Sequence, residues 1–185
     1  MTIIHANDPT TKFLTLLYEM REDVSAHIDE SSTNADVQYA IRSSEDTIMM
    51  LGHGNKYGLF SKPNKIGKQE RFLITDRHVQ FLRGKTCIGI WCYANMFAEK
   101  YKLHGLFSGM IISELQEAID LEVAATKEEI DREMEKFANR LKYSPIGVDI
   151  VRFQQVGSID IRTHLKLTFV DADRTIRRMR LSVLL

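Results

Sequence analysis

Two short apolar runs limit the possible folds of this chain more than any other feature. They are "TIMML" (47–51) and "TCIGIWC" (86–92), and a residue that can do chemistry stands at the end of each, His53 and Cys92 respectively. Runs this short with no polar face are typical of strands that are covered on both sides. We therefore expect them at the centre of a parallel sheet that lies between two layers of helices.

Strand-like and helix-like patterns alternate along the rest of the chain. Strands are predicted at 2–6, 47–51, 86–91 and 106–113, helical segments at 11–23, 34–44, 75–84, 95–105 and most of 114–142, and a loop at 55–71. This alternation predicts an α/β fold, a three-layer α/β/α sandwich with a mostly parallel central sheet. The segments 163–170 and 176–185 alternate in polarity and predict a C-terminal β-hairpin.

The length of 185 residues indicates a single domain over 1–185. We expect its core at about 1–145, followed by a C-terminal strand or hairpin extension at about 146–185. Nothing in the sequence indicates an oligomeric state.

Composition excludes some classes of partner and compartment. Lys plus Arg equals Asp plus Glu, 25 of each, so no overall field draws the chain to nucleic acid or to an anionic membrane. No secretory signal or bilayer-length apolar run is visible. Cys87 and Cys92 lie five apart in one predicted strand, on opposite faces, and cannot bridge each other. Reduced thiols lead us to expect a cytoplasmic protein with no nucleic-acid or membrane partner.

The ends of the two apolar runs form the first candidate site. Ligands of open parallel sheets bind outside the carboxyl ends of the strands, where His53 and Cys92 stand. The segment 54–85 holds one loop and one helix, which suits a crossover between neighbouring strands. An imidazole can activate a nearby thiol, and the amides of Gly54 and Cys92 are candidate donors to an oxyanion.

Plainer interpretations of the same residues stay open. A free cysteine is often a buried packing residue, so Cys92 could be structural. A zinc site from His5, His53, Cys92 and His104 lacks ligand spacing, and we expect no metal and no cofactor. The basic loop at 61–71 reads most simply as a solvated lid.

The order of these motifs resembles that of the caspase-like cysteine peptidases, which include caspases, metacaspases, legumains, gingipains, separases and CHAT domains. The resemblance rests on "GHG" (52–54) after one apolar strand and on "IGIWCYA" (88–94) about forty residues later, and covers residues 1 to about 115. One departure is Trp91, which stands where the family has a small residue before the cysteine. Strand alternation should point Trp91 away from Cys92, so it need not block a site.

The resemblance implies a peptidase that acts on a peptide or protein substrate. Cys92 would be the nucleophile, His53 its partner, and the amides of Gly54 and Cys92 the oxyanion hole. The pocket for the residue before the cleaved bond would lie near Asp8 and the pair Ser113 and Glu114, and an acid there implies a Lys or Arg substrate residue.

Two alternatives to this reading remain open. Asp8 could simply cap the first helix, and Glu114 could simply begin the next one. The whole domain could also be a catalytically inactive caspase-like module that binds a protein or small ligand in the same crevice.

Overall fold

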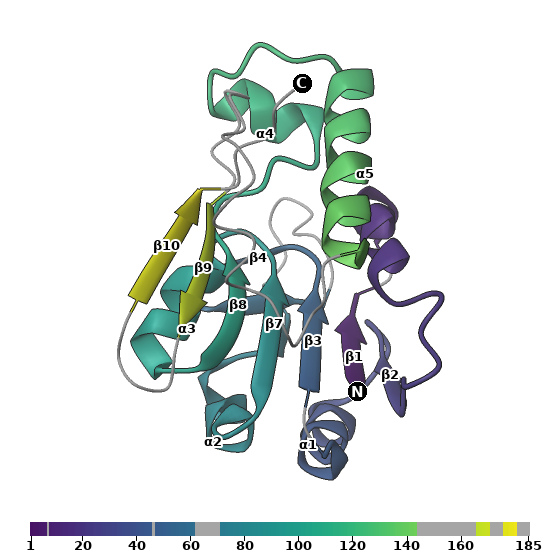
Figure 1. The fold of residues 1–185 in the computed structure, drawn as a ribbon, viewed down its shortest axis with the longest axis vertical. Helices are drawn as coiled ribbons and strands as arrows, with labels where there is room; N and C mark the ends of the chain where they lie inside the picture. The colour runs from purple at the N-terminus through teal and green to yellow at the C-terminus, as the bar shows by residue number, and fades with distance from the viewer. Residues whose placement is uncertain (7, 46, 62–70, 144–165, 171–175, 181–185) are drawn as a thin grey trace.

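A parallel sheet forms the centre of the molecule, as the two apolar runs predict. The computed structural model describes residues 1–6, 8–45, 47–61, 71–143, 166–170 and 176–180. The five parallel strands are β1 (Thr2–His5), β2 (Ala26–Ile28), β3 (Thr47–Leu51), β7 (Thr86–Ile90) and β8 (His104–Ser108). Their order across the sheet is β2-β1-β3-β7-β8 (Figure 1), which makes β3 and β7 neighbours.

Two antiparallel strands extend this sheet at one edge. β9 (Lys166–Val170) pairs with β8, and β10 (Ile176–Arg180) pairs with β9. The predicted antiparallel C-terminal pair is thus confirmed, and it continues the main sheet. No helix in the described ranges combines the length and the apolar character that a bilayer-spanning segment needs.

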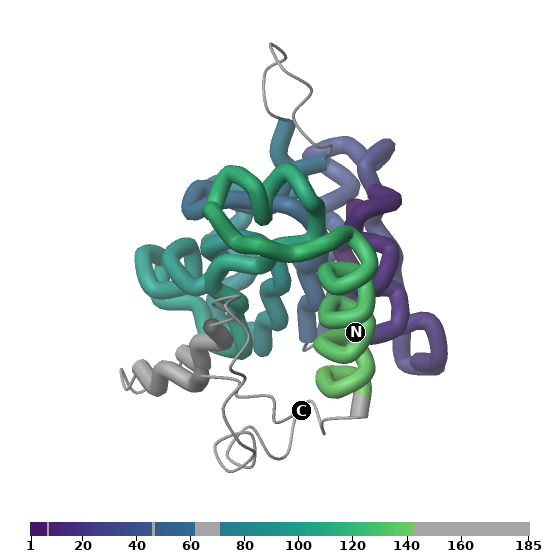
Figure 2. Tube along the Cα trace, turned by 90° about the horizontal axis from the view of Figure 1, so that it is seen from above, coloured from purple at the N-terminus to yellow at the C-terminus, as the bar shows by residue number. Residues whose placement is uncertain are grey.

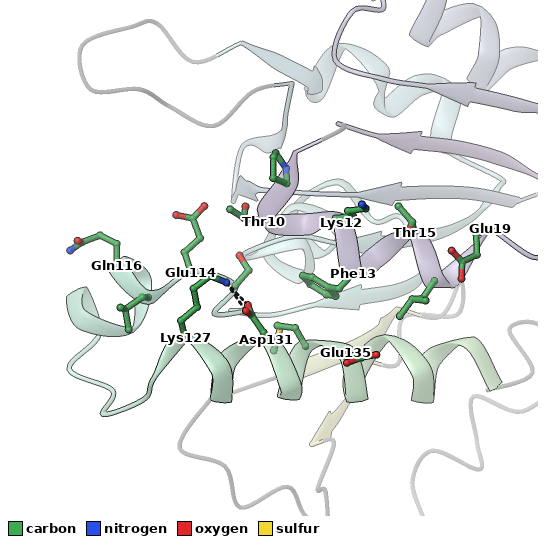
Figure 3. Close-up of a pocket in the computed structure, with 15 residues that line it drawn as sticks. Thr10, Lys12, Phe13, Thr15, Glu19, Glu114, Gln116, Lys127, Asp131 and Glu135 are labelled. Carbon is green, nitrogen blue, oxygen red and sulfur yellow. Dashed lines mark hydrogen bonds and ion pairs between the residues drawn. The ribbon is translucent and has the colours of Figure 1, made fainter.

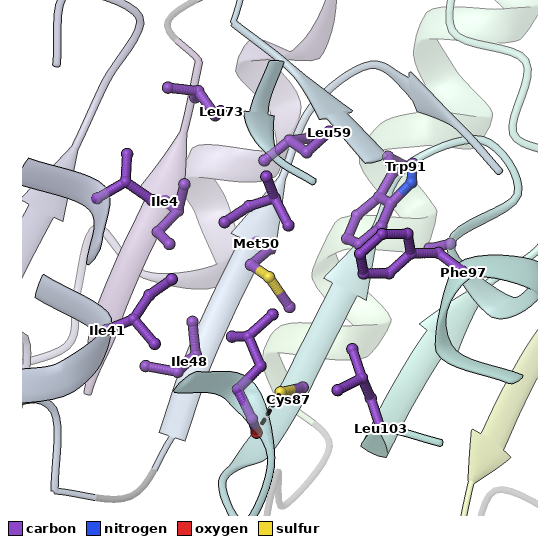
Figure 4. Close-up of a cluster of buried hydrophobic side chains, with 14 of the residues drawn as sticks. Ile4, Ile41, Ile48, Met50, Leu59, Leu73, Cys87, Trp91, Phe97 and Leu103 are labelled. Carbon is purple, nitrogen blue, oxygen red and sulfur yellow. Dashed lines mark hydrogen bonds between the residues drawn. The ribbon is translucent and has the colours of Figure 1, made fainter. Parts of the chain in front are cut away.

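Helices cover both faces of the sheet and confirm the three-layer sandwich. One face packs against α1 (Asn34–Ser43), α2 (Val79–Leu82) and α3 (Ala94–Tyr101) through a cluster that includes Ile48, Met50 and Trp91 (Figure 4). The other face packs against the 3-10 helix η1 (Pro9–Leu17) and α5 (Lys127–Tyr143) through Met49 and Leu51, among others. Alternate residues of β3 therefore face alternate layers.

The first helical segment differs from the predicted α-helix over 11–23. It is a 3-10 helix that ends at Leu17, and its buried residues are Thr11, Leu14 and Leu17. A spacing of three residues keeps these side chains on one face when the helix has three residues per turn. Asp8 is the N-cap of η1, and the short edge strand β2 follows this helix in the chain.

A small antiparallel sheet includes the first part of the loop predicted at 55–71 and the residues directly after it. It contains β4 (Gly54–Asn55), β5 (Gly58–Phe60) and β6 (Phe72–Ile74). Gly58 has φ 152°, and a Cβ there would lie 1.9 Å from the carbonyl oxygen of Ile74, so a glycine is required where β5 meets β6. The proposed basic lid at 61–71 lies almost entirely outside the described residues.

The strand predicted at 106–113 starts earlier, at His104, and ends at Ser108. Gly105 does not end the preceding helix: it has φ 139° in β8 and lies so close to β7 that a Cβ would meet the Cys87 carbonyl oxygen. The predicted helical region 114–142 consists of α4 (Leu115–Asp120) and α5. Seen from above, the segment between β8 and α5 crosses the carboxyl end of the sheet, and α5 lies along η1 (Figure 2).

Candidate active site

His53 and Cys92 stand at the same rim of the sheet. β3 and β7 run parallel with Leu51 opposite Ile90, and each reactive residue comes two positions after its strand's last residue. Both side chains therefore leave the sheet at its carboxyl edge, as the sequence predicts. Within the described ranges, however, no hydrogen bond joins the Cys92 thiol to the His53 imidazole: His53 Nε2 is bonded to the Thr10 hydroxyl, and Cys92 Sγ donates to the Ile111 carbonyl oxygen.

Three carboxylates and one hydroxyl surround the His53 imidazole. Its Nε2 lies 2.6 Å from the Thr10 hydroxyl, 3.5 Å from Glu114 Oε1 and 3.8 Å from Asp8 Oδ1. Its Nδ1 lies 3.9 Å from Glu117 Oε1. The imidazole is 13% exposed, so these charges act on it with little solvent between them.

Among the predicted substrate-binding residues, Asp8 and Glu114 lie at the helix starts that the sequence left open, and both also lie beside His53. Asp8 caps η1 by accepting a hydrogen bond from the Thr10 amide at 2.9 Å, and it also lies beside His53. Glu114 immediately precedes α4 and faces His53 as well. Ser113 instead fixes Glu117: its amide and hydroxyl donate to Glu117 Oε2 at 2.8 and 3.2 Å.

One group of these side chains has the composition of a metal-ligand set. Ligand atoms of Asp8, His53 and Glu114 all lie within 4.8 Å of one another. One imidazole nitrogen and two carboxylate oxygens are donors that Zn²⁺ or Mn²⁺ accepts. The set differs from the one weighed on sequence alone, since His104 begins β8 at the opposite end of the sheet and His5 is bonded to Tyr18 and Thr11.

The Cys92 thiol is covered in this structure. The residue is 9% exposed, and its Sγ donates to the carbonyl oxygen of Ile111 at 3.0 Å. Burial, followed by the negative charge of Glu117, raises the pKa of the Cys92 thiol to about 12. The thiol is therefore protonated at neutral pH while residues 111–117 stay in place. Cys87 is fully buried in the cluster on the opposite face, and neither cysteine forms a disulfide, as predicted.

The backbone turns sharply directly after Cys92. Tyr93 has φ 65° and ψ 26°, the left-handed region, and it precedes α3 without a side-chain cap. A bulky residue in this region costs about 1–2 kcal/mol, and such strain is concentrated at functional sites.

Gly54 and Trp91 fit together on the other face of the rim. A Cβ on Gly54 would lie 2.3 Å from Trp91 Cδ1 and 2.5 Å from the Gly58 carbonyl oxygen. The fully buried Trp91 donates from Nε1 to the Asn55 carbonyl oxygen at 3.1 Å. Trp91 thus packs in the cluster opposite to that of Cys92, as strand alternation predicts.

The register of the small sheet also orients the Gly54 amide. The Phe60 amide donates to the His53 carbonyl oxygen, which makes His53 and Phe60 a hydrogen-bonded pair. Gly54 and Leu59 form the next pair, which is then a non-hydrogen-bonded one. The Gly54 N–H accordingly points away from β5, which is the orientation that a hydrogen-bond donor to a ligand needs.

A groove between η1 and α5 begins beside this cluster. Its volume is about 850 Å³, and Ser113 is among its lining residues. Thr10 and Glu114 line one end and Glu19 the other (Figure 3). Its lining residues include Phe13 and other apolar side chains. Its carboxylates are Glu19, Glu114, Asp131 and Glu135, against the two lysines Lys12 and Lys127, so the groove carries an excess of negative charge.

Comparisons with protein-family models, with curated proteins and with solved structures found no match to this chain. Sequence reasoning missed two residues of the site, Thr10 and Glu117. The available signals were the Asp8-Pro-Thr10 helix start and Glu117, which stands three residues after Glu114 at the N3 position of a capping box.

Proposed function

We propose that this chain is a caspase-like cysteine peptidase in which Cys92 attacks a peptide carbonyl and His53 transfers the proton. The observation that carries the proposal is the pairing of β3 with β7, which puts the two residues just beyond the carboxyl ends of neighbouring parallel strands. The resemblance in motif order implies the same arrangement. The strained turn at Tyr93, directly after the nucleophile, adds support.

The reaction is a two-step acyl transfer. His53 takes the thiol proton of Cys92, and the sulfur forms a bond to the carbonyl carbon of the substrate. The tetrahedral oxyanion would be bound by the amides of Gly54 and Cys92. His53 returns its proton to the departing amine as the C–N bond breaks, which leaves a thioester. Water, deprotonated by the same imidazole, then hydrolyses the thioester and restores the free thiol.

The charges around His53 favour a basic side chain in the substrate. Asp8, Glu114 and Glu117 have His53 as their only ionic partner among the residues that the structure describes. Three carboxylates with no lysine or arginine partner form an unbalanced negative site. A substrate Lys or Arg would supply the missing charge, and an Arg could bind a carboxylate with two hydrogen bonds.

The nucleophile must be uncovered before it can react. Residues 111–117 hold the thiol through the Ile111 carbonyl oxygen and bring the Glu117 charge near it. A bound basic substrate would compete for Glu117 and so weaken both restraints. The proposal therefore includes movement of this segment when the substrate binds.

A second candidate is a binding module that uses the same rim without catalysis. One specific observation favours it: the Cys92 thiol is buried, is bonded to a carbonyl oxygen and has a pKa raised to about 12. A protonated, covered sulfur is a packing residue unless something exposes it.

Alkylation rates distinguish the two candidates. With a lysyl peptide present to displace residues 111–117, the peptidase predicts that iodoacetamide modifies Cys92 faster than Cys87 and that His53→Ala abolishes the difference, with Cys92→Ala as the control for assignment. Equal and slow labelling of both cysteines with the peptide present favours the binding module, whereas slow labelling without the peptide is expected of both candidates. Incubation with a random peptide library then tests specificity: cuts after Lys or Arg that disappear with Cys92→Ala support the proposal, and cuts after other residues contradict the acidic pocket.

Substitution of one acid beside His53 tests the preference for a basic substrate residue more directly. Glu114→Gln should raise KM for a lysyl peptide severalfold with little change in kcat, because it removes a binding charge. Glu135→Gln is the matched control, since Glu135 lines the groove but is not among the acids around His53. An equal effect of both changes would show that the groove's overall charge, and no local pocket, sets the preference.

A further inference from the structure

The Thr10 hydroxyl lies between the Asp8 carboxylate and the His53 imidazole. It is 2.5 Å from Asp8 Oδ1 and 2.6 Å from His53 Nε2, which are the two shortest contacts at the site. The Thr10 amide also donates to the same carboxylate oxygen. Because Asp8 caps η1 and Thr10 is in its first turn, the helix start holds both groups in place.

The chemistry of these groups fixes the direction of the hydrogen bonds. A carboxylate accepts only, so the hydroxyl proton of Thr10 goes to Asp8. The Thr10 oxygen must then accept, and the hydrogen it accepts is on His53 Nε2. In the neutral imidazole this leaves Nδ1 without a hydrogen, as the basic nitrogen.

The free nitrogen lies on the side of the imidazole that faces Glu117. Nδ1 is 3.9 Å from Glu117 Oε1. The charge of that same Glu117 also acts on the Cys92 thiol, so Glu117 lies within electrostatic range of both groups.

We propose that Asp8, Thr10 and His53 form a hydrogen-bond relay that fixes the His53 imidazole in its Nε2–H tautomer and reserves Nδ1 for the Cys92 proton. Thr10 is thus a positioning residue, and this inference rests on the proposed peptidase function. Asp8 acquires a second task besides the substrate pocket: it orients Thr10 and lies 3.8 Å from the imidazolium that forms during the reaction.

The relay explains why a threonine suits this position. A β-branched side chain has few rotamers, so the hydroxyl stays aimed at Nε2. Glu114 Oε1, the next acceptor from Nε2, lies at 3.5 Å on a side chain that is 36% exposed, and it is the weaker partner.

Three variants test the relay. Thr10→Val keeps the shape and removes the hydroxyl, and Thr10→Ser restores the hydroxyl. Thr11→Val is the matched control, because the Thr11 hydroxyl is buried in the same helix but bonds to His5 and the Asp8 carbonyl oxygen. The first readout is the ¹⁵N NMR signature of the His53 ring, which reports the nitrogen that carries the hydrogen. The His53→Ala spectrum assigns the signal.

We expect wild type, Thr10→Ser and Thr11→Val to show one Nε2–H tautomer, and Thr10→Val to show a mixture. The second readout is the alkylation rate of Cys92, which Thr10→Val should lower roughly 10-fold, the lower end of the loss when a partner that orients a histidine is removed. Thr10→Ser should restore most of the rate. Thermal unfolding of each variant separates these effects from loss of fold.

The outcomes separate the relay from the peptidase function. An unchanged tautomer in Thr10→Val overturns the relay, even if His53→Ala slows alkylation and so supports the dyad. A changed tautomer with no effect of His53→Ala on Cys92 supports the hydrogen-bond arrangement but refutes the dyad that it is proposed to serve. A rate loss in Thr11→Val as large as that in Thr10→Val also overturns the relay.

Discussion

The protonation state of Cys92 gives a quantitative prediction about the resting protein. Burial and the Glu117 charge raise the pKa of this thiol from 9.0 to about 12. At pH 8 the thiolate fraction is then about 10⁻⁴, compared with about 10⁻¹ for an unperturbed thiol, a difference of roughly 4 kcal/mol. Because the thiolate is the reactive form, iodoacetamide should alkylate Cys92 about 1,000-fold more slowly than a free cysteine.

The pH profile follows from the same value. The rate should rise about tenfold per pH unit between pH 7 and 10, without a plateau, because the thiol remains mostly protonated in this range. Mass spectrometry of the Cys92 peptide measures the rate. Cys87, whose thiol pKa burial also raises to about 12, is the internal reference in the same samples.

The variant Glu117→Gln isolates the electrostatic contribution to the raised pKa of the Cys92 thiol. The amide keeps the size and an acceptor for the Ser113 bonds but removes the charge. A nearby carboxylate acting on a covered thiol is worth roughly 1 kcal/mol, so the alkylation rate should rise about fivefold. Glu135→Gln, in the groove, should leave the rate unchanged.

Two results would refute this reasoning. A wild-type rate that levels off below pH 8 would mean that a thiolate already exists in the resting protein, against the burial argument. An alkylation rate for Glu117→Gln equal to that of wild type would show that the Glu117 charge does not affect the pKa of the Cys92 thiol.

Three further predictions concern stability. Burial lowers the pKa of His5 from 6.5 to about 4, so as the pH falls the imidazole is protonated in the unfolded chain before it is protonated in the folded one, and about 3 kcal/mol of stability should be lost between pH 6.5 and 4. Urea unfolding of wild type and His5→Gln at both pH values checks this prediction. An equal loss of stability in the two proteins would contradict it. Gly105→Ala should cost at least about 3 kcal/mol because its Cβ would meet the Cys87 carbonyl oxygen, whereas Gly84→Ala, also at positive φ but in open space, should cost about 1 kcal/mol; similar melting temperatures would refute the steric argument. Thr33→Ala removes the N-cap of α1 and should cost about 1 kcal/mol in chemical unfolding, and no loss would show that the capping box is dispensable.

The central part of the fold was predictable because its signals are local. The runs at 47–51 and 86–91 have no polar face, and only burial on both sides accommodates them. Their order and the crossover length then place His53 and Cys92 at one rim. The opposite faces of Cys87 and Cys92 follow from a strand period of two.

The parts that sequence reasoning missed depend on contacts between distant segments. In the sequence, Gly105 resembles a glycine that ends a helix, and Gly58 resembles a loop residue. Only the close contacts with β7 and β6, respectively, show why each position needs a glycine. The η1 helix has a periodicity of three that an α-helical template does not detect. The covering of Cys92 by Ile111 could not be read from either segment, because no periodic pattern predicts the path of a connection across a sheet edge.

The fit between Gly54 and Trp91 gives the tryptophan before Cys92 a structural role. The indole fills the space that a side chain at position 54 would need, and it tethers the Asn55 carbonyl. The backbone that follows His53 is thereby joined to the backbone that precedes Cys92, through contacts on the face of the sheet opposite to the Cys92 side chain. A smaller residue at 91 would remove this connection and leave the two sides of the rim free to move apart, even with His53, Cys92 and the acids around His53 unchanged.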